Sequence, residues 1–321
     1  MWHAEGPPDR AALCVRQHEP CSMPENWLAA MASESMPKIK TTDGISLYYE
    51  ESGAGVPVVF IHEFAGDYRT WEPQMRCFGR SHRCITYSQR GYPPSDVPDD
   101  PARYGQDIAR GDVLALMDAL GVDKAHIVGH SMGAYTALHV GIRHPQRCIS
   151  VTAAGCGWGS LPDPAARQAM REQAAENAKL FSENTMAKAA AIYADSATRH
   201  PQKYKDPRGY AEFVRLLSEH SPRGHALTMT MLQARRPTLW DLQAELKKFS
   251  VPLLVIVGDE DETCLDGSLF LKRAAPTAAL LVIPRSGHTI TSEEPAAVDA
   301  ALAELFAATE NRRWLAHKPP Q

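Results

Sequence analysis

A serine flanked by two glycines lies between an expected strand and an expected helix. The segment Ala125–Val128 is short and apolar, as in a buried strand, and an Ala-rich helical pattern begins at Gly133. A chain that passes this abruptly from strand to helix turns at one residue, and small residues two positions away on each side prevent a clash. Gly129 and Gly133 occupy these positions. The pattern therefore predicts a nucleophile elbow in which Ser131 presents its hydroxyl at a helix N-terminus.

A serine nucleophile requires a base and a group that orients the base. Two loops that follow expected strands supply candidates, at residues 258–262 and 284–288. Such loops meet at the carboxyl edge of a parallel sheet. The chain order Ser, Asp, His is the order used with this elbow. We expect His288 to be the base, and the residues alone leave both Asp259 and Asp261 as the orienting acid.

The overall composition restricts the classes of partner. The chain of 321 residues has 34 basic and 38 acidic side chains. Because charge is nearly balanced and no basic patch stands out, nucleic-acid binding is not expected. No apolar run approaches the roughly 20 residues of a membrane span, and the N-terminus lacks an apolar signal-peptide core. We expect a cytoplasmic protein that acts on a small molecule, without membrane attachment; the oligomeric state is left open.

The number and spacing of the cysteines favour reduced thiols over disulfide bonds. There are seven, an odd number, scattered at positions 14, 21, 77, 84, 148, 156 and 264. No C-x-x-C or Cys/His spacing typical of a metal site is present in the sequence. Cys148 and Cys156 lie near an apolar strand and are expected to be small core residues. We therefore expect neither a metal nor a cofactor.

Apolar runs and helical periodicity alternate along most of the chain. The alternation predicts a mostly parallel sheet flanked by helices. The first two strands are expected to form a hairpin around Asp43-Gly44. The expected strands cover residues 38–41, 45–49, 56–61, 84–87, 125–128, 148–153, 251–257 and 278–283. The expected helices cover residues 71–78, 108–120, 133 to about 144, 268–274 and 295–309.

The alternation is interrupted once. Residues 157–249 show no convincing strand, and their Ala-, Glu-, Gln- and Lys-rich pattern, cut by prolines, predicts several short helices. We expect this segment to be a helical cap inserted into a core formed by residues 36–156 and 250–310. Residues 1–35 are expected to be a disordered extension, with Met36 as a usable alternative start, and residues 311–321 a tail.

Over residues 38–309 the sequence resembles the α/β-hydrolases. It is most similar to the branch with a helical cap between strands six and seven, which holds esterases, enol-lactonases, carbon–carbon bond hydrolases and cofactor-free haloperoxidase-like enzymes. The motifs that match are His62-Glu63-Phe64, the Arg90-Gly91 loop that ends at Asp96, Gly129-His130-Ser131-Met132-Gly133, Gly258-x-x-Asp261 and Gly287-His288.

The resemblance implies a role for each matching residue. Ser131 resembles the nucleophile, His288 the general base, and Asp261, three residues after Gly258, the acid that orients the base. Asp259 is then expected to form a turn. By the same resemblance, the backbone N–H groups of Phe64 and Met132 form the oxyanion hole.

Four residues in or near these motifs carry separate expectations. The family usually has glycine at the position of Glu63. A carboxylate facing an oxyanion would oppose catalysis, so we expect Glu63 to be an exposed loop acid that points away, or to meet a cation such as Arg69. His62 is expected to shape its loop, and His130 to be structural. Trp158, together with Phe64 and Met132, is expected to line the substrate pocket.

The leading hypothesis is a cofactor-independent serine hydrolase that cleaves an ester, a lactone or a similar carbonyl substrate through an acyl-enzyme on Ser131. Carbon–carbon bond cleavage or perhydrolysis on the same triad is an alternative within the same fold. A non-catalytic receptor that binds a small ligand in the pocket is an alternative from another class.

Overall fold

The computed structural model describes residues 36–315. The predictions for residues 1–35 and for the last six residues of the tail lie outside the described residues.

One eight-stranded sheet forms the centre of the fold. Its strand order is β1-β2-β4-β3-β5-β6-β7-β8, and all pairs are parallel except β1 with β2 and β2 with β4. The predicted mostly parallel sheet and the N-terminal hairpin are confirmed. The strands are β1 Lys38–Lys40, β2 Ser46–Ser52, β3 Pro57–Ile61, β4 Arg83–Tyr87, β5 Ala125–His130, β6 Cys148–Ala154, β7 Leu253–Gly258 and β8 Ala278–Ile283.

The apolar runs of the central strands are buried on both faces of the sheet. In β3, Val59 and Ile61 contribute to the core on one face, and Val58 and Phe60 contribute to the core on the other. A strand whose successive side chains point to opposite faces must be apolar throughout when helices cover both faces. This explains why continuous apolar runs, without alternation, mark these strands in the sequence.

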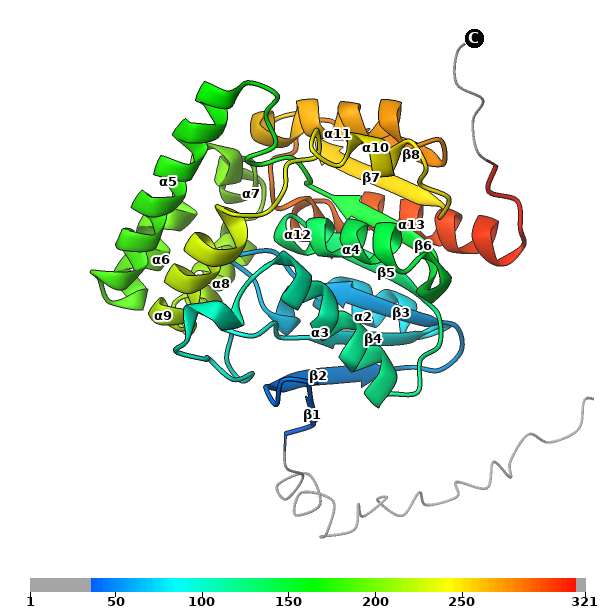
Figure 1. The fold of residues 1–321 in the computed structure, drawn as a ribbon, viewed down its shortest axis with the longest axis horizontal. Coiled ribbons are helices and arrows are strands. Elements are labelled where there is room, and N and C mark those ends of the chain that lie inside the picture. Colours follow the sequence, from blue (N-terminus) through cyan, green and yellow to red (C-terminus); the bar gives the residue numbers. More distant parts are fainter. Residues whose placement is uncertain (1–35, 316–321) are drawn as a thin grey trace, which may run out of the picture. The chain divides into compact units, whose positions relative to one another are not determined.

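Helices cover both faces of the sheet (Figure 1). Helices α3, α4 and α11 contribute Leu116, Leu138 and Leu271 to one core. Helices α2 and α13 contribute Met75 and Leu302 to the other. The bounds are α2 Glu72–Phe78, α3 Gln106–Ala119, α4 Met132–Arg143, α11 Glu262–Ala274, α12 Ile290–Glu293 and α13 Pro295–Glu310, with 3₁₀ turns at Tyr68–Trp71, Pro101–Arg103 and Pro145–Arg147.

Two helices differ from the sequence expectation. Helix α11 begins at Glu262, six residues earlier than expected, with Asp261 as its N-cap residue. Its first two residues, Glu262 and Thr263, are polar and exposed and give no apolar periodicity. The short helix α12 was not expected, because four residues are too few for periodicity to reveal.

The segment between β6 and β7 is helical. It contains several short helices, as expected, but begins with a longer one, α5, of 19 residues. Asp163, Thr185, Asp206 and Ser221 cap four of the helices through their side chains. The elements are α5 Pro164–Ser182, α6 Met186–Ala194, a 3₁₀ turn Ala197–Arg199, α7 His200–Lys205, α8 Pro207–Leu217, α9 Pro222–Leu227, a π-helix Thr228–Gln233 and α10 Gln243–Leu246.

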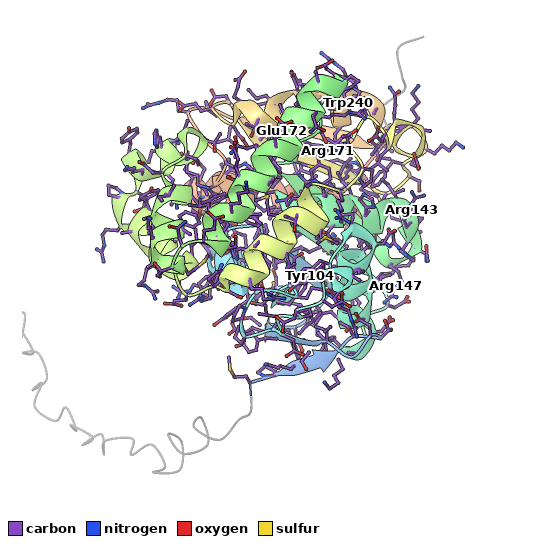
Figure 2. The ribbon with its side chains drawn as sticks, turned by 60° about the vertical axis from the view of Figure 1, so that its left-hand side comes forward. Tyr104, Arg143, Arg147, Arg171, Glu172 and Trp240 are labelled. Atoms are coloured by element: carbon purple, nitrogen blue, oxygen red, sulfur yellow. The ribbon has the colours of Figure 1, made fainter. Side chains whose placement is uncertain are left out.

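A third apolar core joins this helical segment to the sheet. Phe181 of α5 and Met229 of the π-helix belong to the same cluster as Phe64, Tyr92 and Met132. The last three follow the carboxyl ends of β3, β4 and β5. Helices α5 to α9 gather on one side of the ribbon in Figure 1, and in Figure 2 Arg171 and Glu172 lie on the exposed side of α5. The helical segment therefore packs against the edge at which the predicted site residues lie.

The structure also bears on the thiols and on membrane spanning. Cys77, Cys84, Cys148, Cys156 and Cys264 are free, and all except Cys77 are buried. Cys148 and Cys156 belong to the core on one face of the sheet, as predicted. The other two cysteines of the chain lie outside the described residues. Across residues 36–315, none of the helices has the length and apolar character needed to cross a membrane.

Candidate active site

Ser131 lies at a sharp turn between β5 and α4. Its φ of 53° and ψ of −111° place it in the left-handed region that side chains rarely adopt. A methyl group at Gly129 would overlap the main chain of Gly133, and one at Gly133 would overlap the main chain of Ile61. Glycine is therefore required on both sides of the turn, as the sequence predicted. The Ser131 N–H donates to the carbonyl of Ala154 at 2.8 Å, which fixes the turn to β6.

The structure brings Ser131, His288 and Asp261 together. The distance from His288 Nε2 to Ser131 Oγ is 2.9 Å, and the distance from His288 Nδ1 to Asp261 Oδ2 is 2.7 Å. The three side chains come from the turn after β5, the loop after β8 and the turn between β7 and α11. Because a carboxylate only accepts, Nδ1 carries the hydrogen of the second bond, and the lone pair on Nε2 faces the serine hydroxyl.

Burial and the partner's charge shift the pKa values of Asp261 and His288 in opposite directions. Burial of the Asp261 carboxyl disfavours its charged form, but attraction to His288 and the hydrogen bond from it outweigh burial and lower the pKa of Asp261. Burial likewise favours the neutral imidazole of His288, and the Asp261 charge outweighs it and raises the pKa of His288. Asp261 is therefore ionised at neutral pH and stabilises a positive charge on His288.

Asp259 has a different environment. It is exposed, and its Oδ1 accepts the N–H of Ser286 at 3.2 Å. The contact holds the loop after β8 against the end of β7. Of the two candidate acids, Asp261 contacts the His288 ring, and Asp259 has the turn-forming position that the resemblance implied.

The main chain of His288 is held from two sides. Its N–H donates to the carbonyl of Thr198 at 2.7 Å, and its carbonyl lies 2.7 Å from Nε2 of His130. Because a carbonyl only accepts, the His130 ring carries its hydrogen on Nε2. Burial lowers the pKa of His130 to about 4, so this ring is neutral. The sequence predicted a structural His130 but gave no signal for Thr198.

The expected oxyanion groups belong to two neighbouring elements. Met132 is the first residue of α4, and Phe64 lies in the loop after β3, whose main chain closely approaches Gly133. Among the described residues, neither the Phe64 N–H nor the Met132 N–H donates to another main-chain carbonyl. His62 fixes the loop: its Nδ1 donates to the Glu63 carbonyl at 2.7 Å. Its Nε2 accepts the Gln89 N–H at 3.0 Å.

The sequence of the chain also matches a family model. The model describes the α/β hydrolase fold and matches residues 56–295. The chain belongs to this family. It is an enzyme of the hydrolase class, as the sequence predicted.

The proteins that this hydrolase resembles are named for several different activities. It is 28% identical over 252 residues to 3-oxoadipate enol-lactonase 1 of Acinetobacter baylyi, a match that covers 74% of this chain and 84% of the relative. It is 32% identical over 161 residues to an epoxide hydrolase of Caballeronia sordidicola, a match that spans about half of each chain, 50% and 49%. The solved structure of a thermophilic esterase from Thermogutta terrifontis superposes with a TM-score of 0.73 at 25% identity, covering 86% of this chain and 99% of the esterase.

Glu63 of the hydrolase is not the exposed loop acid that the sequence favoured. It is 2% exposed and forms a two-pronged ion pair with Arg199. The distance from Nη1 to Oε1 is 3.1 Å and that from Nη2 to Oε2 is 2.5 Å. The expectation of a cation was right in kind, but the partner is Arg199 of the helical segment and not Arg69.

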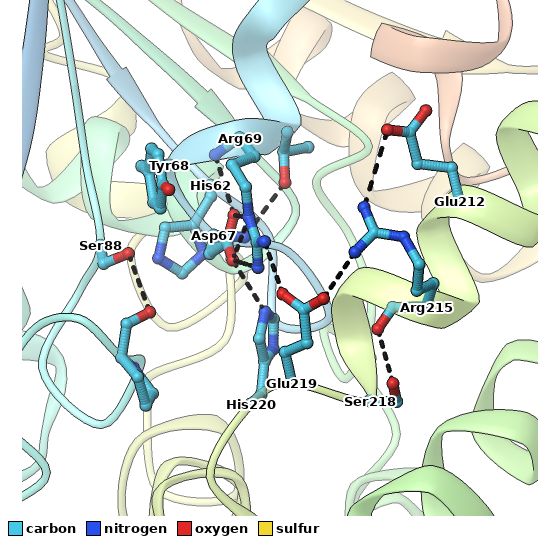
Figure 3. A network of polar contacts seen from close by, with 12 residues as sticks. His62, Asp67, Tyr68, Arg69, Ser88, Glu212, Arg215, Ser218, Glu219 and His220 are labelled. Carbon is cyan, nitrogen blue, oxygen red and sulfur yellow. Dashed lines mark hydrogen bonds and ion pairs between the residues drawn. The ribbon is translucent and has the colours of Figure 1, made fainter. Parts of the chain in front are cut away.

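Figure 3 shows the Arg69 guanidinium between the carboxylates of Asp67 and Glu219. The Arg69 guanidinium bonds Asp67 through Nε and Nη2, and Glu219 through Nη1 at 2.6 Å. His220 adds a second contact to the Asp67 carboxylate at 3.1 Å. Arg69 is therefore occupied by two acids, one of them only two residues away. No local pattern marked Arg199, because 136 residues separate it from Glu63.

A cavity of about 370 Å³ opens beside the serine. Ser131 and His288 border it, and Phe64 and Trp158, two of the residues expected to line a substrate pocket, lie in its wall. The Met132 side chain instead borders a separate small void with Tyr92 and Leu232, so the expectation for this side chain is wrong. The remaining lining residues come mostly from the helical segment: Gln173, Asn177, Leu180, Ile192, Tyr193, Ser196, Ala197, Thr198, Arg199, Met229 and Gln233, with Thr263.

One group of side chains in the described part of the chain has the composition of a metal site. Ligand atoms of Asp261, Cys264 and His288 lie within 4.8 Å of one another. The Asp261 carboxylate and the His288 ring are already bonded to each other. Burial raises the pKa of the Cys264 thiol well above its usual range, and its Sγ lies 3.2 Å from the Gly155 carbonyl. A metal would require the thiolate, so the environment favours the proton over a cation.

Proposed function

We propose that the protein is a serine hydrolase that cleaves an ester, a lactone or a similar carbonyl substrate through an acyl-enzyme on Ser131. The observation that supports this most is the continuous hydrogen-bonded chain from Asp261 through His288 to Ser131, with distances of 2.7 and 2.9 Å. The chain ends at a cavity large enough for a small organic substrate.

In the first half of the reaction, His288 Nε2 takes the hydroxyl proton as Ser131 Oγ attacks the substrate carbonyl carbon. The carbonyl oxygen becomes an oxyanion, which the N–H groups of Phe64 and Met132 stabilise by about 3 kcal/mol each. As the tetrahedral intermediate collapses, the bond to the leaving group breaks and His288 returns its proton to that group. An ester between the substrate acyl group and Ser131 remains.

In the second half, His288 takes a proton from water, and the resulting hydroxide attacks the acyl carbon. Collapse returns the proton to Ser131 and releases the carboxylic acid. The ionised Asp261 stabilises the imidazolium in both halves. The buried position of the Asp261–His288 bond keeps water from competing for it.

A serine at the elbow favours carbonyl chemistry over epoxide opening, which is the named activity of one relative. Attack of Ser131 Oγ on an epoxide carbon would leave an ether on the enzyme. Water does not hydrolyse an unactivated ether at a useful rate, whereas it hydrolyses an ester. Turnover therefore requires an acyl group on Ser131.

We further propose that residues 157–249 act as a cap that selects the substrate. Their helices contribute most of the cavity lining, and they pack on Phe64 and Met132 in a common apolar cluster. Substrate choice would then depend on residues that stand apart from the reacting groups, while Ser131, His288 and Asp261 supply the chemistry.

Labelling with a fluorophosphonate probe tests the proposal. Ser131 should be the one residue labelled rapidly, because a base-paired serine beside oxyanion donors is far more nucleophilic than a surface serine. Mass spectrometry of the labelled peptide identifies the site, and Ser131→Ala is the control for background labelling. Label on another serine, or none at all, would remove Ser131 as the nucleophile.

A substrate panel separates the proposal from its alternatives. Short p-nitrophenyl esters and lactones should be turned over by the wild-type protein and not by Ser131→Ala. Tight binding of a small molecule without turnover of any member would instead favour a receptor. Faster cleavage of a carbon–carbon bond or faster peroxyacid formation than ester hydrolysis would favour the other reactions on the same three residues.

A further inference from the structure

The cavity beside Ser131 has a simple distribution of charge. Among the described residues that line it, Arg199 is the one Arg, Lys, Asp or Glu, and His288 is the one histidine. The other lining side chains are apolar, aromatic, hydroxyl or amide groups. The electrostatic character of the cavity therefore depends on the state of a single guanidinium group.

That guanidinium group is paired with a protein carboxylate. Both of its terminal nitrogens bond the Glu63 carboxylate, and the pair is almost completely buried, with side-chain exposures of 3% for Arg199 and 2% for Glu63. The rings of Phe213 and Tyr193 lie 4.8 and 5.6 Å from the guanidinium carbon. The Glu63 carboxylate therefore balances the guanidinium charge and occupies the edge formed by its two terminal nitrogens.

We propose that Glu63 determines substrate charge by neutralising Arg199, so that the cavity accepts acyl chains without charge and rejects those that end in a carboxylate. This inference rests on the proposed acyl-transfer function and adds the substrate class to it. It assigns Glu63 a selective role at a position where the family pattern has glycine.

The physical reason is the free energy of burying an unpaired charge. A substrate carboxylate in this cavity would leave water and find its one candidate cation already paired. An uncharged chain loses little on leaving water and packs against apolar lining residues such as Leu180, Ile192 and Met229. The difference in binding free energy between the charged and the uncharged acyl chain therefore depends on whether Arg199 is available to pair with a substrate carboxylate.

The pairing is mutual, because Arg199 also neutralises Glu63. Glu63 directly precedes Phe64, whose N–H is proposed to stabilise the oxyanion. An unpaired carboxylate beside this N–H would raise the energy of the oxyanion, as like charges do. Removing Arg199 alone should therefore slow the hydrolysis of every ester, whereas removing Glu63 alone should change the preference between esters.

Two esters that differ by one terminal group measure the preference. These are p-nitrophenyl hexanoate and mono-p-nitrophenyl adipate, which have acyl chains of equal length. At pH 7.5 the wild-type kcat/KM for hexanoate should exceed that for adipate by about 100-fold or more. In Glu63→Gln, which keeps the size and an acceptor oxygen, the ratio should fall by about tenfold or more.

Two further variants test whether the Arg199 charge causes the change in ester preference. In Glu63→Gln combined with Arg199→Gln, the guanidinium charge is removed as well, so the ratio should return to the wild-type value. In Arg199→Gln alone, kcat should fall for both esters and the ratio should not move toward adipate. This single variant keeps the inference testable if Glu63→Gln does not fold.

Asp112→Asn is the matched control. Asp112 forms a similarly buried two-pronged pair with Arg90, at 2.7 and 2.6 Å, away from the cavity. Its loss should lower stability without moving the ratio between the esters, because misfolding reduces both rates equally.

Two results would overturn the inference. One is a wild-type enzyme that prefers adipate, and the other is a Glu63→Gln ratio equal to the wild-type ratio. Failure of the proposed function gives a different result, namely no hydrolysis of either ester and no fluorophosphonate label on Ser131.

Discussion

The carbonyl of Thr198 accepts the main-chain N–H of His288 at 2.7 Å. The next residue, Arg199, bonds Glu63 in the loop that carries Phe64. Two consecutive residues of the helical segment thus hold two loops of the sheet, one with the proposed base and one with a proposed oxyanion donor. The helical segment is for this reason part of what positions the reacting groups, besides lining the cavity.

Activity should be lost on the acid side as His288 becomes protonated. Only the neutral imidazole accepts the Ser131 proton, and Asp261 raises the pKa of His288 above its usual value of 6.5. A raised pKa keeps the ring charged up to a higher pH. As the pH is lowered, kcat/KM should therefore begin to fall before pH 6.5 is reached, and it should be nearly abolished by about pH 5. A pH profile on an uncharged ester measures this. A flat profile from pH 4.5 to 8 would contradict a histidine base.

The orienting acid can be identified by comparing two substitutions. Asp261→Asn replaces the acceptor of the Nδ1 hydrogen with a group that can donate instead, which favours the wrong tautomer of His288. It should lower kcat by about 10³- to 10⁴-fold, with little change in Tm. It should also move the acid limb of the pH profile to lower pH, because the charge that raises the pKa of His288 is gone.

Asp259→Asn is the matched control for this change. It keeps an acceptor for the Ser286 N–H in an exposed turn, so kcat should remain within about tenfold of the wild-type value. Both variants should be measured on one ester, with folding checked by circular dichroism. The opposite pattern would reverse the assignment, and a loss smaller than tenfold in both would place the acid elsewhere.

The close approach at the elbow can be tested by stability. In Gly133→Ala the added methyl group would overlap the main chain of Ile61, so the substitution should destabilise the protein by about 1–3 kcal/mol. Gly111→Ala is the control, because Gly111 is an exposed residue of α3 with open space around it. It should stabilise by roughly 0.5–1 kcal/mol. Urea unfolding measures both, and equal stability of the two variants would contradict the tight elbow.

Local sequence predicted the strands well because each central strand is buried on both faces. The run 56–61 is continuously apolar, and the strand observed is Pro57–Ile61. The start of α11 gave no comparable signal, because the polar residues Glu262 and Thr263 at a helix N-terminus resemble a loop. Periodicity thus identifies an element by its buried face and is least informative where an element begins in contact with solvent.

The elbow could be predicted from the sequence alone, since its cause is local. Ser131 adopts a positive φ between Gly129 and Gly133, and the steric requirement for those glycines arises within a few residues of chain and from the adjacent strand. The choice between Asp259 and Asp261 depended on family resemblance. The structure separates them physically, since one is exposed and the other lies against the His288 ring.

Local patterns in the sequence predicted the order of the strands and of the main helices of the core, and the residue types at the proposed reacting positions. Tertiary structure alone decided the partners of the charged and polar groups around them: Arg199 for Glu63, the Thr198 carbonyl for the His288 N–H, and a separate void for the Met132 side chain. The reason is the range of the interactions. Backbone sterics and burial periodicity act over a few residues and leave a local pattern, whereas an ion pair between residues 136 positions apart depends on how the whole chain packs.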